Sequence, residues 1–169
     1  EILLKHNVIT GATLVFRAEL IPEVLPVPSL WLHDEWIALA ASAAGFSGVF
    51  LENCLIKYRQ HPGQMIGGLR ESFRDSLRHA RHTESSRYAT EKRKYLQALW
   101  RCAPKGNGRF SRRLIKSKVE HLGTRELIYR QSNSSRNLAA IASEVASGRY
   151  HRYSNGWLSV GKDLFATVY

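Results

Sequence analysis

The chain contains few cysteines and no long apolar run, and both shortages exclude classes of protein. Its two cysteines, Cys54 and Cys102, are too few and too far apart in sequence for a disulfide framework, so a reducing compartment is the default. The longest nearly apolar stretch, residues 36–51, is interrupted by Ser and Gly and is shorter than the ~20 residues that a bilayer-spanning helix needs. The sequence therefore predicts neither a disulfide-stabilised miniprotein nor a transmembrane protein.

Acidic residues are scarce in the C-terminal part of the chain. Residues 1–69 hold four Lys/Arg and six Asp/Glu, whereas residues 70–169 hold 21 and eight, a net charge of +13. This imbalance indicates an anionic partner, either nucleic acid or the anionic face of a membrane, although a set of solvated Arg-rich helices has the same composition. An apolar content of 44% with 17 aromatic residues argues against a disordered tail.

Residues 1–68 have the pattern of a small α/β unit. Residues 8–16 are rich in β-branched and apolar side chains and predict a buried strand, while residues 49–51 and 54–58 predict two short strands or one bent strand. Such a sheet has few strands and cannot bury both of its faces, which suggests that the chain is part of a larger domain.

A helix is predicted between these strands. Its apolar face runs from Trp36 to Ala44, Asp34 can serve as its N-cap or first-turn acid, and Gly45 is expected to end it as a C′ glycine. Capping alone would explain an aspartate at this place, so a catalytic role for Asp34 needs further support.

Residues 69–169 are predicted to be a basic, mainly helical extension. Long helices are expected over residues 69–103 and 110–130, and a third is expected to be capped by Ser134 or Ser135 and to stop at Gly148. A segment that interleaves basic with aromatic residues then leads to a last short helix. The aromatic rings of this segment and helix suit a lipid headgroup region; they belong to Tyr150, Tyr153, Trp157 and Phe165.

Three short motifs, in order, resemble the acceptor half of a family-2 glycosyltransferase of the GT-A type. They are Asn7-Val8-Ile9-Thr10-Gly11-Ala12-Thr13, then His33-Asp34-Glu35-Trp36, then Tyr58-Arg59-Gln60-His61 followed by Gly67. One departure is Gln64, where the family more often has Asn. The resemblance implies a partial Rossmann-like sheet over residues 1–68 and an inverting sugar transfer from a nucleotide-sugar to a hydroxyl.

The resemblance also implies roles for individual residues. Asp34 would be the catalytic base that takes the proton from the attacking hydroxyl, a form of assistance worth roughly 10²–10⁴-fold in rate. Arg59 and His61 would be candidates for stabilising the leaving diphosphate, with His61 also a candidate metal ligand. The acceptor would be bound near Gly11, Ala12, His33, Glu35 and Trp36.

A divalent metal, Mg²⁺ or Mn²⁺, is expected for the full-length enzyme, but its main ligands are not in this chain. Family-2 enzymes place them in an Asp-x-Asp motif, and the only aspartates here are Asp34, Asp75 and Asp163. The donor-binding half is therefore expected upstream of Glu1, and this chain alone is expected to be inactive.

The expected partners are a nucleotide-sugar, a saccharide or lipid-linked acceptor, and the anionic inner face of a bacterial cytoplasmic membrane, in polysaccharide assembly, without nucleic acid. The alternative is a non-enzymatic basic helical module that binds nucleic acid or an anionic surface.

Overall fold

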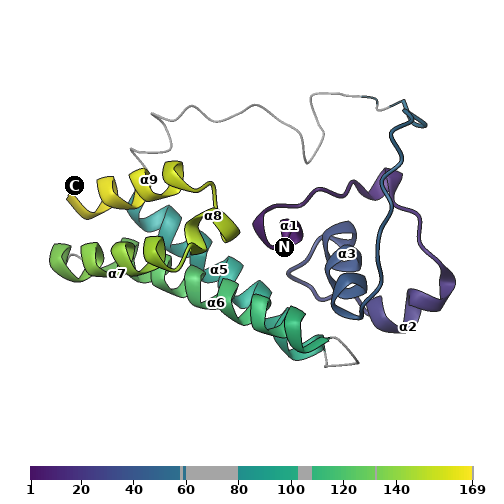
Figure 1. Ribbon diagram of the computed structural model, residues 1–169, viewed down its shortest axis with the longest axis horizontal. Helices are drawn as coiled ribbons and strands as arrows, with labels where there is room; N and C mark the ends of the chain where they lie inside the picture. Colours follow the sequence, from purple (N-terminus) through teal and green to yellow (C-terminus); the bar gives the residue numbers. More distant parts are fainter. Residues whose placement is uncertain (58, 60–79, 103–107, 132, 169) are drawn as a thin grey trace.

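The computed structural model describes residues 1–57, 59, 80–102, 108–131 and 133–168, and every regular element in these ranges is helical (Figure 1). The N-terminal part contains five elements: α1 (Ile2–Lys5), the 3₁₀ turns η1 (Gly11–Thr13) and η2 (Ala18–Leu20), α2 (Ile21–Val24) and α3 (His33–Ala43). The C-terminal part contains α5 (Ala80–Arg101), α6 (Gly108–Arg130), α7 (Ser134–Ala146), α8 (Arg149–Tyr153) and α9 (Trp157–Val168).

The predicted α/β sheet is wrong for the described residues, which form no strand. Residues 8–16 instead contain the η1 turn, and residues 46–57 run as irregular chain. Val49 and Phe50 are 88% and 86% exposed there. A β-branched sequence is stabilised as a strand by hydrogen bonds and side-chain pairs from a neighbouring strand. These segments have the composition of strands, but the described part of the chain gives them no such neighbour.

The predicted helix after Asp34 is confirmed, together with its stop signal. α3 ends in a Schellman motif: the N–H of Gly45 donates to the carbonyl of Ser42 at 3.2 Å, and the N–H of Phe46 donates to that of Ala41 at 3.0 Å. Gly45 has φ +92°, a conformation that side chains with a Cβ rarely adopt.

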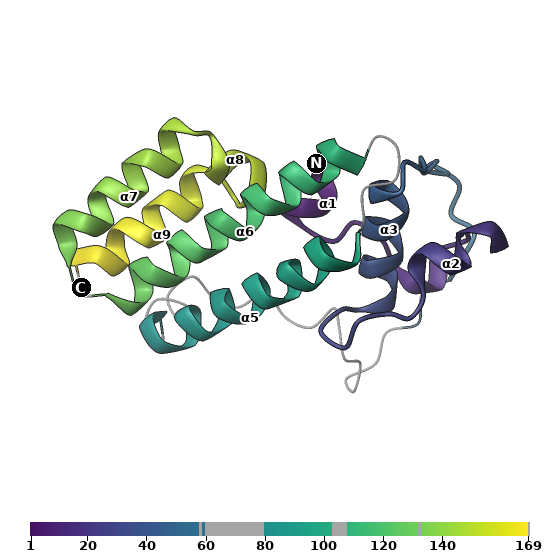
Figure 2. The same ribbon diagram turned by 90° about the horizontal axis from the view of Figure 1, so that it is seen from below.

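α5 and α6 form a long helical hairpin. α7 and α9 lie side by side along the end of the hairpin that is distant from α3 (Figure 2). The buried residues of both helices recur at spacings of three, four or seven, which gives each helix one buried stripe. They include Tyr88, Tyr95 and Ala98 on α5, and Ile115, Leu122 and Tyr129 on α6.

The third predicted helix is confirmed, but its cap is one residue earlier than expected. The side chain of Asn133 accepts a hydrogen bond from the N–H of Arg136 at 3.1 Å, whereas Ser134 and Ser135 were the predicted caps. Gly148 stops the helix region with φ +68°, as its position predicted.

The N-terminal part packs against the hairpin through aromatic side chains. The ring of Trp31 lies 5.6 Å from that of Trp36 and 5.2 Å from that of Tyr95 on α5. One continuous cluster of buried residues extends from Leu4 to Ala166, so the core crosses the predicted boundary between residues 1–68 and 69–169.

Candidate functional site

Asp34 lies in the first turn of α3, and its carboxylate joins this helix to the η1 turn. One oxygen, Oδ2, accepts a hydrogen bond from the N–H of Gly11 at 3.0 Å, and Oδ1 accepts one from the N–H of Glu35 at 2.7 Å. A carboxylate is favoured here because the helix N-terminus carries partial positive charge. Two of the three motifs named above, which lie 23 residues apart in sequence, therefore meet at this carboxylate.

The His33 ring also packs closely on Gly11. A Cβ added at Gly11 would lie 2.5 Å from His33 Nε2, so a glycine is needed for the ring to pack this closely. The structure thus brings Gly11, His33 and Asp34 together; we call them the Asp34 cluster. Ala12 is the next residue of the η1 turn and is exposed.

The Asp34 cluster could accept a proton from a bound hydroxyl. The Asp34 side chain is half-buried and the His33 ring is exposed, so one face of the cluster is open to solvent. Each carboxylate oxygen has two lone pairs and uses one of them on a backbone N–H, which leaves a lone pair on each for another donor.

Glu35 and Trp36 lie in the core, away from this open face. Glu35 Oε2 pairs with Lys94 Nζ on α5 at 2.6 Å, and the same ammonium lies 4.5 Å from the centre of the Trp31 ring. The indole N–H of Trp36 donates to the carbonyl of Val24 at 2.7 Å. These contacts attach α3 to α5 and α2, so they explain both residues without a ligand.

Of the predicted donor-side residues, Arg59 is exposed and His61 lies outside the described residues. Within the part of the chain that the structure describes, no group of three or more His, Cys, Asp or Glu side chains could hold a metal ion. The described residues therefore do not fit a metal centre.

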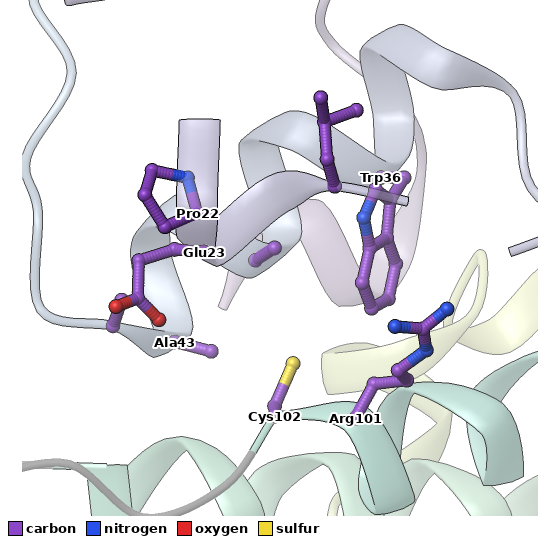
Figure 3. Close-up of a pocket in the computed structure, with 9 residues that line it drawn as sticks. Pro22, Glu23, Trp36, Ala43, Arg101 and Cys102 are labelled. Carbon is purple, nitrogen blue, oxygen red and sulfur yellow. The ribbon is translucent and has the colours of Figure 1, made fainter. Parts of the chain in front are cut away.

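A cavity of about 210 Å³ lies between α2, α3 and the end of α5 (Figure 3). Trp36 and Ala40 line one side, and Arg101 and Cys102 line another. Burial raises the pKa of the Cys102 thiol to about 11, so the thiol is protonated at neutral pH. The cavity is smaller than the ~300 Å³ at which ligand pockets usually begin.

A wider groove of about 690 Å³ runs between residues 27–30 and α5. The exposed ring of Trp100 lines it beside Arg93, Gln97 and Arg101. Sequence reasoning missed this groove, because its walls come from segments about 70 residues apart.

Sequence reasoning also missed a buried network of polar side chains that extends across α6, α7 and the α8–α9 turn. Ser154 Oγ lies 2.8 Å from His121 Nε2, and His121 Nδ1 lies 2.6 Å from Glu144 Oε2. Serine, histidine and carboxylate follow in the order found in nucleophilic triads. Two charged residues extend this network: Arg149 lies 3.2 Å from Glu144, and Arg125 lies 3.1 Å from Ser154.

We interpret this buried network of polar side chains as structural. His121 is fully buried, and burial lowers its pKa although the hydrogen bond to Glu144 opposes that shift. The Ser154 hydroxyl already has two partners, because it lies between His121 and Arg125. The sequence signal was available: Lys118, His121 and Arg125 occupy the buried stripe of α6 at the spacing of core residues.

No helix in the described residues is long and apolar enough to cross a membrane. Comparison with known proteins found no match to a protein-family model, to a curated protein or to a solved structure. The interpretation of the Asp34 cluster therefore rests on its own geometry and on the motifs of the sequence.

Proposed function

We propose that this chain contributes the acceptor side of an inverting glycosyltransferase, with Asp34 as the general base. The observation that supports the proposal is the hydrogen bond between the Asp34 carboxylate and the N–H of Gly11. It joins two of the motifs on which the resemblance rests and holds the carboxylate at the solvent side of α3 beside the His33 ring.

The chemistry of the cluster suits a hydroxyl acceptor. The attacking hydroxyl must lose its proton as it displaces the nucleoside diphosphate at the anomeric carbon, and a positioned carboxylate can take that proton. The Gly11 and Glu35 N–H groups fix the orientation of the carboxylate. Because His33 is exposed next to Asp34, it can contact the acceptor. The nucleotide-sugar would be held by a donor side with its own acidic metal motif.

The test is the variant Asp34→Asn in the full-length enzyme. We expect turnover to fall by about 10²-fold or more with donor affinity unchanged, because the carboxylate acts on the acceptor. Sugar transfer is measured with labelled nucleotide-sugars and saccharide or lipid-linked acceptors. The amide of Asn can still accept one backbone hydrogen bond, so the fold is preserved.

Glu35→Gln is the matched control. It changes the neighbouring carboxylate in the same way, but Glu35 pairs with Lys94 in the core, so we expect lower stability and near-normal turnover. Normal turnover in Asp34→Asn would reduce Asp34 to a residue that ties η1 to α3 and would overturn the proposal.

A further inference from the structure

α9 carries most of its large apolar side chains on the outside of the bundle, whereas its inside combines Ser159, Asp163 and Thr167 with the apolar Val160 and Ala166. Trp157 and Val168, at its two ends, are 66% and 73% exposed. At about 100° per residue, the exposed positions fall within an arc of about 120°. This arc, which we call the α9 face, holds no polar side chain and consists of Trp157, Leu158, Gly161, Leu164, Phe165 and Val168.

The inside of α9 is fixed by a buried carboxylate. Asp163 is fully buried and accepts hydrogen bonds from Arg125 at 2.8 and 2.6 Å, from Tyr129 at 2.9 Å and from Tyr150 at 2.6 Å. Turning the α9 face toward the core would remove Asp163 from all three partners. The helix is therefore held with its apolar side toward solvent.

The two tyrosines expected at a lipid surface lie elsewhere. Tyr150 and Tyr153 are buried in the core, so that part of the sequence interpretation is wrong, whereas Trp157 and Phe165 belong to the α9 face.

Both ends of the α9 face are flanked by positive charge. At its C-terminal end, where Ser134 Oγ donates to the carbonyl of Thr167, Arg130 and Arg136 are exposed. At its N-terminal end, Arg152 of α8 is exposed, and its Nε lies 3.7 Å from the exposed carboxylate of Glu1, so the positive charge is stronger at the C-terminal end. In residues 130–168 the only acidic residues are Glu144 and Asp163, and the structure places both in the interior.

This combination selects one kind of partner. A second copy of the chain would bring basic ends together in either orientation, and like charges oppose association. Nucleic acid would need cations on the contacting surface itself to neutralise its phosphates, and the α9 face has none. An anionic lipid surface takes apolar side chains below the headgroups and cations beside them.

We propose that the α9 face docks the protein on an anionic membrane, with the helix lying flat in the headgroup region. A helix of 12 residues is about 18 Å long, which suits the interface and is shorter than the ~30 Å hydrocarbon core. The inference deepens the proposed function, since such a surface would present a lipid-linked acceptor. It is tested by vesicle binding alone, so its failure would leave the test of Asp34 unaffected.

The first measurement is tryptophan emission on adding vesicles of phosphatidylcholine with about 30% phosphatidylglycerol. Two of the four tryptophans, Trp31 and Trp36, are buried, and Trp100 and Trp157 are exposed. We expect a blue shift and protection from quenching in the wild type and in Trp100→Phe. Both should be lost in Trp157→Phe, because the ring that enters the headgroup region is then absent.

The second measurement is sedimentation of the same vesicles with two triple variants of equal composition. Trp157→Ser, Leu158→Ser and Leu164→Ser should weaken binding by about tenfold or more, because they remove apolar contacts with lipid. Trp100→Ser, Leu30→Ser and Leu127→Ser change one Trp and two Leu that are also exposed, and should bind as the wild type does.

Three results would overturn the inference. They are equal binding by the two triple variants, equal binding of wild type to vesicles of pure phosphatidylcholine, and displacement from anionic vesicles by an excess of RNA. A fourth result that would overturn it needs no substitution: an unchanged tryptophan emission of the wild type when the protein is bound to vesicles.

Discussion

His121 and Lys118 lie on the buried stripe of α6, where an amphipathic helix ordinarily places apolar side chains. Lys118 Nζ donates to the carbonyl of Tyr153 at 2.8 Å, and burial lowers its pKa to about 8. His121 is held between Glu144 and Ser154. A buried polar group is tolerated when it has partners, and each of these residues fastens α6 to a neighbouring helix.

The stability of the protein should depend on the protonation of His121. Its pKa in the folded state lies below the unfolded value of about 6.5, because burial disfavours the imidazolium. The unfolded chain therefore takes up a proton first as the pH falls, and stability is lost from about pH 6.5 downward. The contribution to the slope is at most about 1.4 kcal/mol per pH unit.

The measurement is urea unfolding of wild type and His121→Gln between about pH 8 and pH 5. Gln retains a donor for Glu144 but does not titrate, so the free energy of unfolding should fall less steeply with pH in the variant. The difference at pH 8, where the imidazole is neutral in both states, gives the cost of the substitution itself. Parallel curves for the two proteins would contradict the prediction.

The Asp34 cluster marks the limit of prediction at the level of residues. The sequence motifs selected Gly11, His33 and Asp34, but Glu35 and Trp36 belonged to the same motif and turned inward. The side chains of consecutive residues on a helix differ in direction by about 100°, so the four residues of one helical motif cannot all face the same site. Which of the four faces solvent depends on the packing of α3 against α2 and α5.

At the level of elements, helices were predictable and strands were not. The ends of α3 and α7 follow from local signals, because Gly45 and Gly148 need the left-handed conformation that stops a helix. Residues 49–51 and 54–58 carry strand composition, but strand formation depends on a partner that composition does not supply. The inverted orientation of α9 also escaped prediction, because it is set by Arg125, Tyr129 and Tyr150 on other helices.

The cap of α7 allows a test at this level. Asn133→Ala removes the side-chain acceptor for the N–H of Arg136 and should lower the free energy of unfolding by about 1 kcal/mol. Ser135→Ala is the control, since its hydroxyl only donates to Asn133 and should cost less. Thermal or urea unfolding measures both. A larger loss of unfolding free energy in Ser135→Ala than in Asn133→Ala would contradict the assignment of Asn133 as the cap.

At the level of the whole molecule, one carboxylate connects the bundle. Asp163 of α9 binds Arg125 and Tyr129 of α6 and Tyr150 of α8, and the guanidinium of Arg125 lies 4.5 Å from the ring centre of Tyr88 on α5. Burial disfavours the charged form of Arg125, but the hydrogen bonds and the charge of Asp163 outweigh it and raise the pKa of Arg125 above its usual value, so the guanidinium is charged in the core. Four helices therefore share one buried ion pair, and we expect α9 to unfold together with the hairpin.

Asp163→Asn tests this connection. The amide keeps the shape but leaves Arg125 as a buried cation without its counter-charge, a change that typically costs about 3–5 kcal/mol. That is a large part of the ~5–15 kcal/mol by which domains are usually stable. Glu126→Gln is the control, because it breaks a partly exposed pair with Lys92 and should cost about 1 kcal/mol or less. Hydrogen exchange should show protection lost in residues 157–168 and in α6 together. Loss confined to α9, or a cost as small as that of Glu126→Gln, would mean that apolar packing and not the ion pair holds the helix in place.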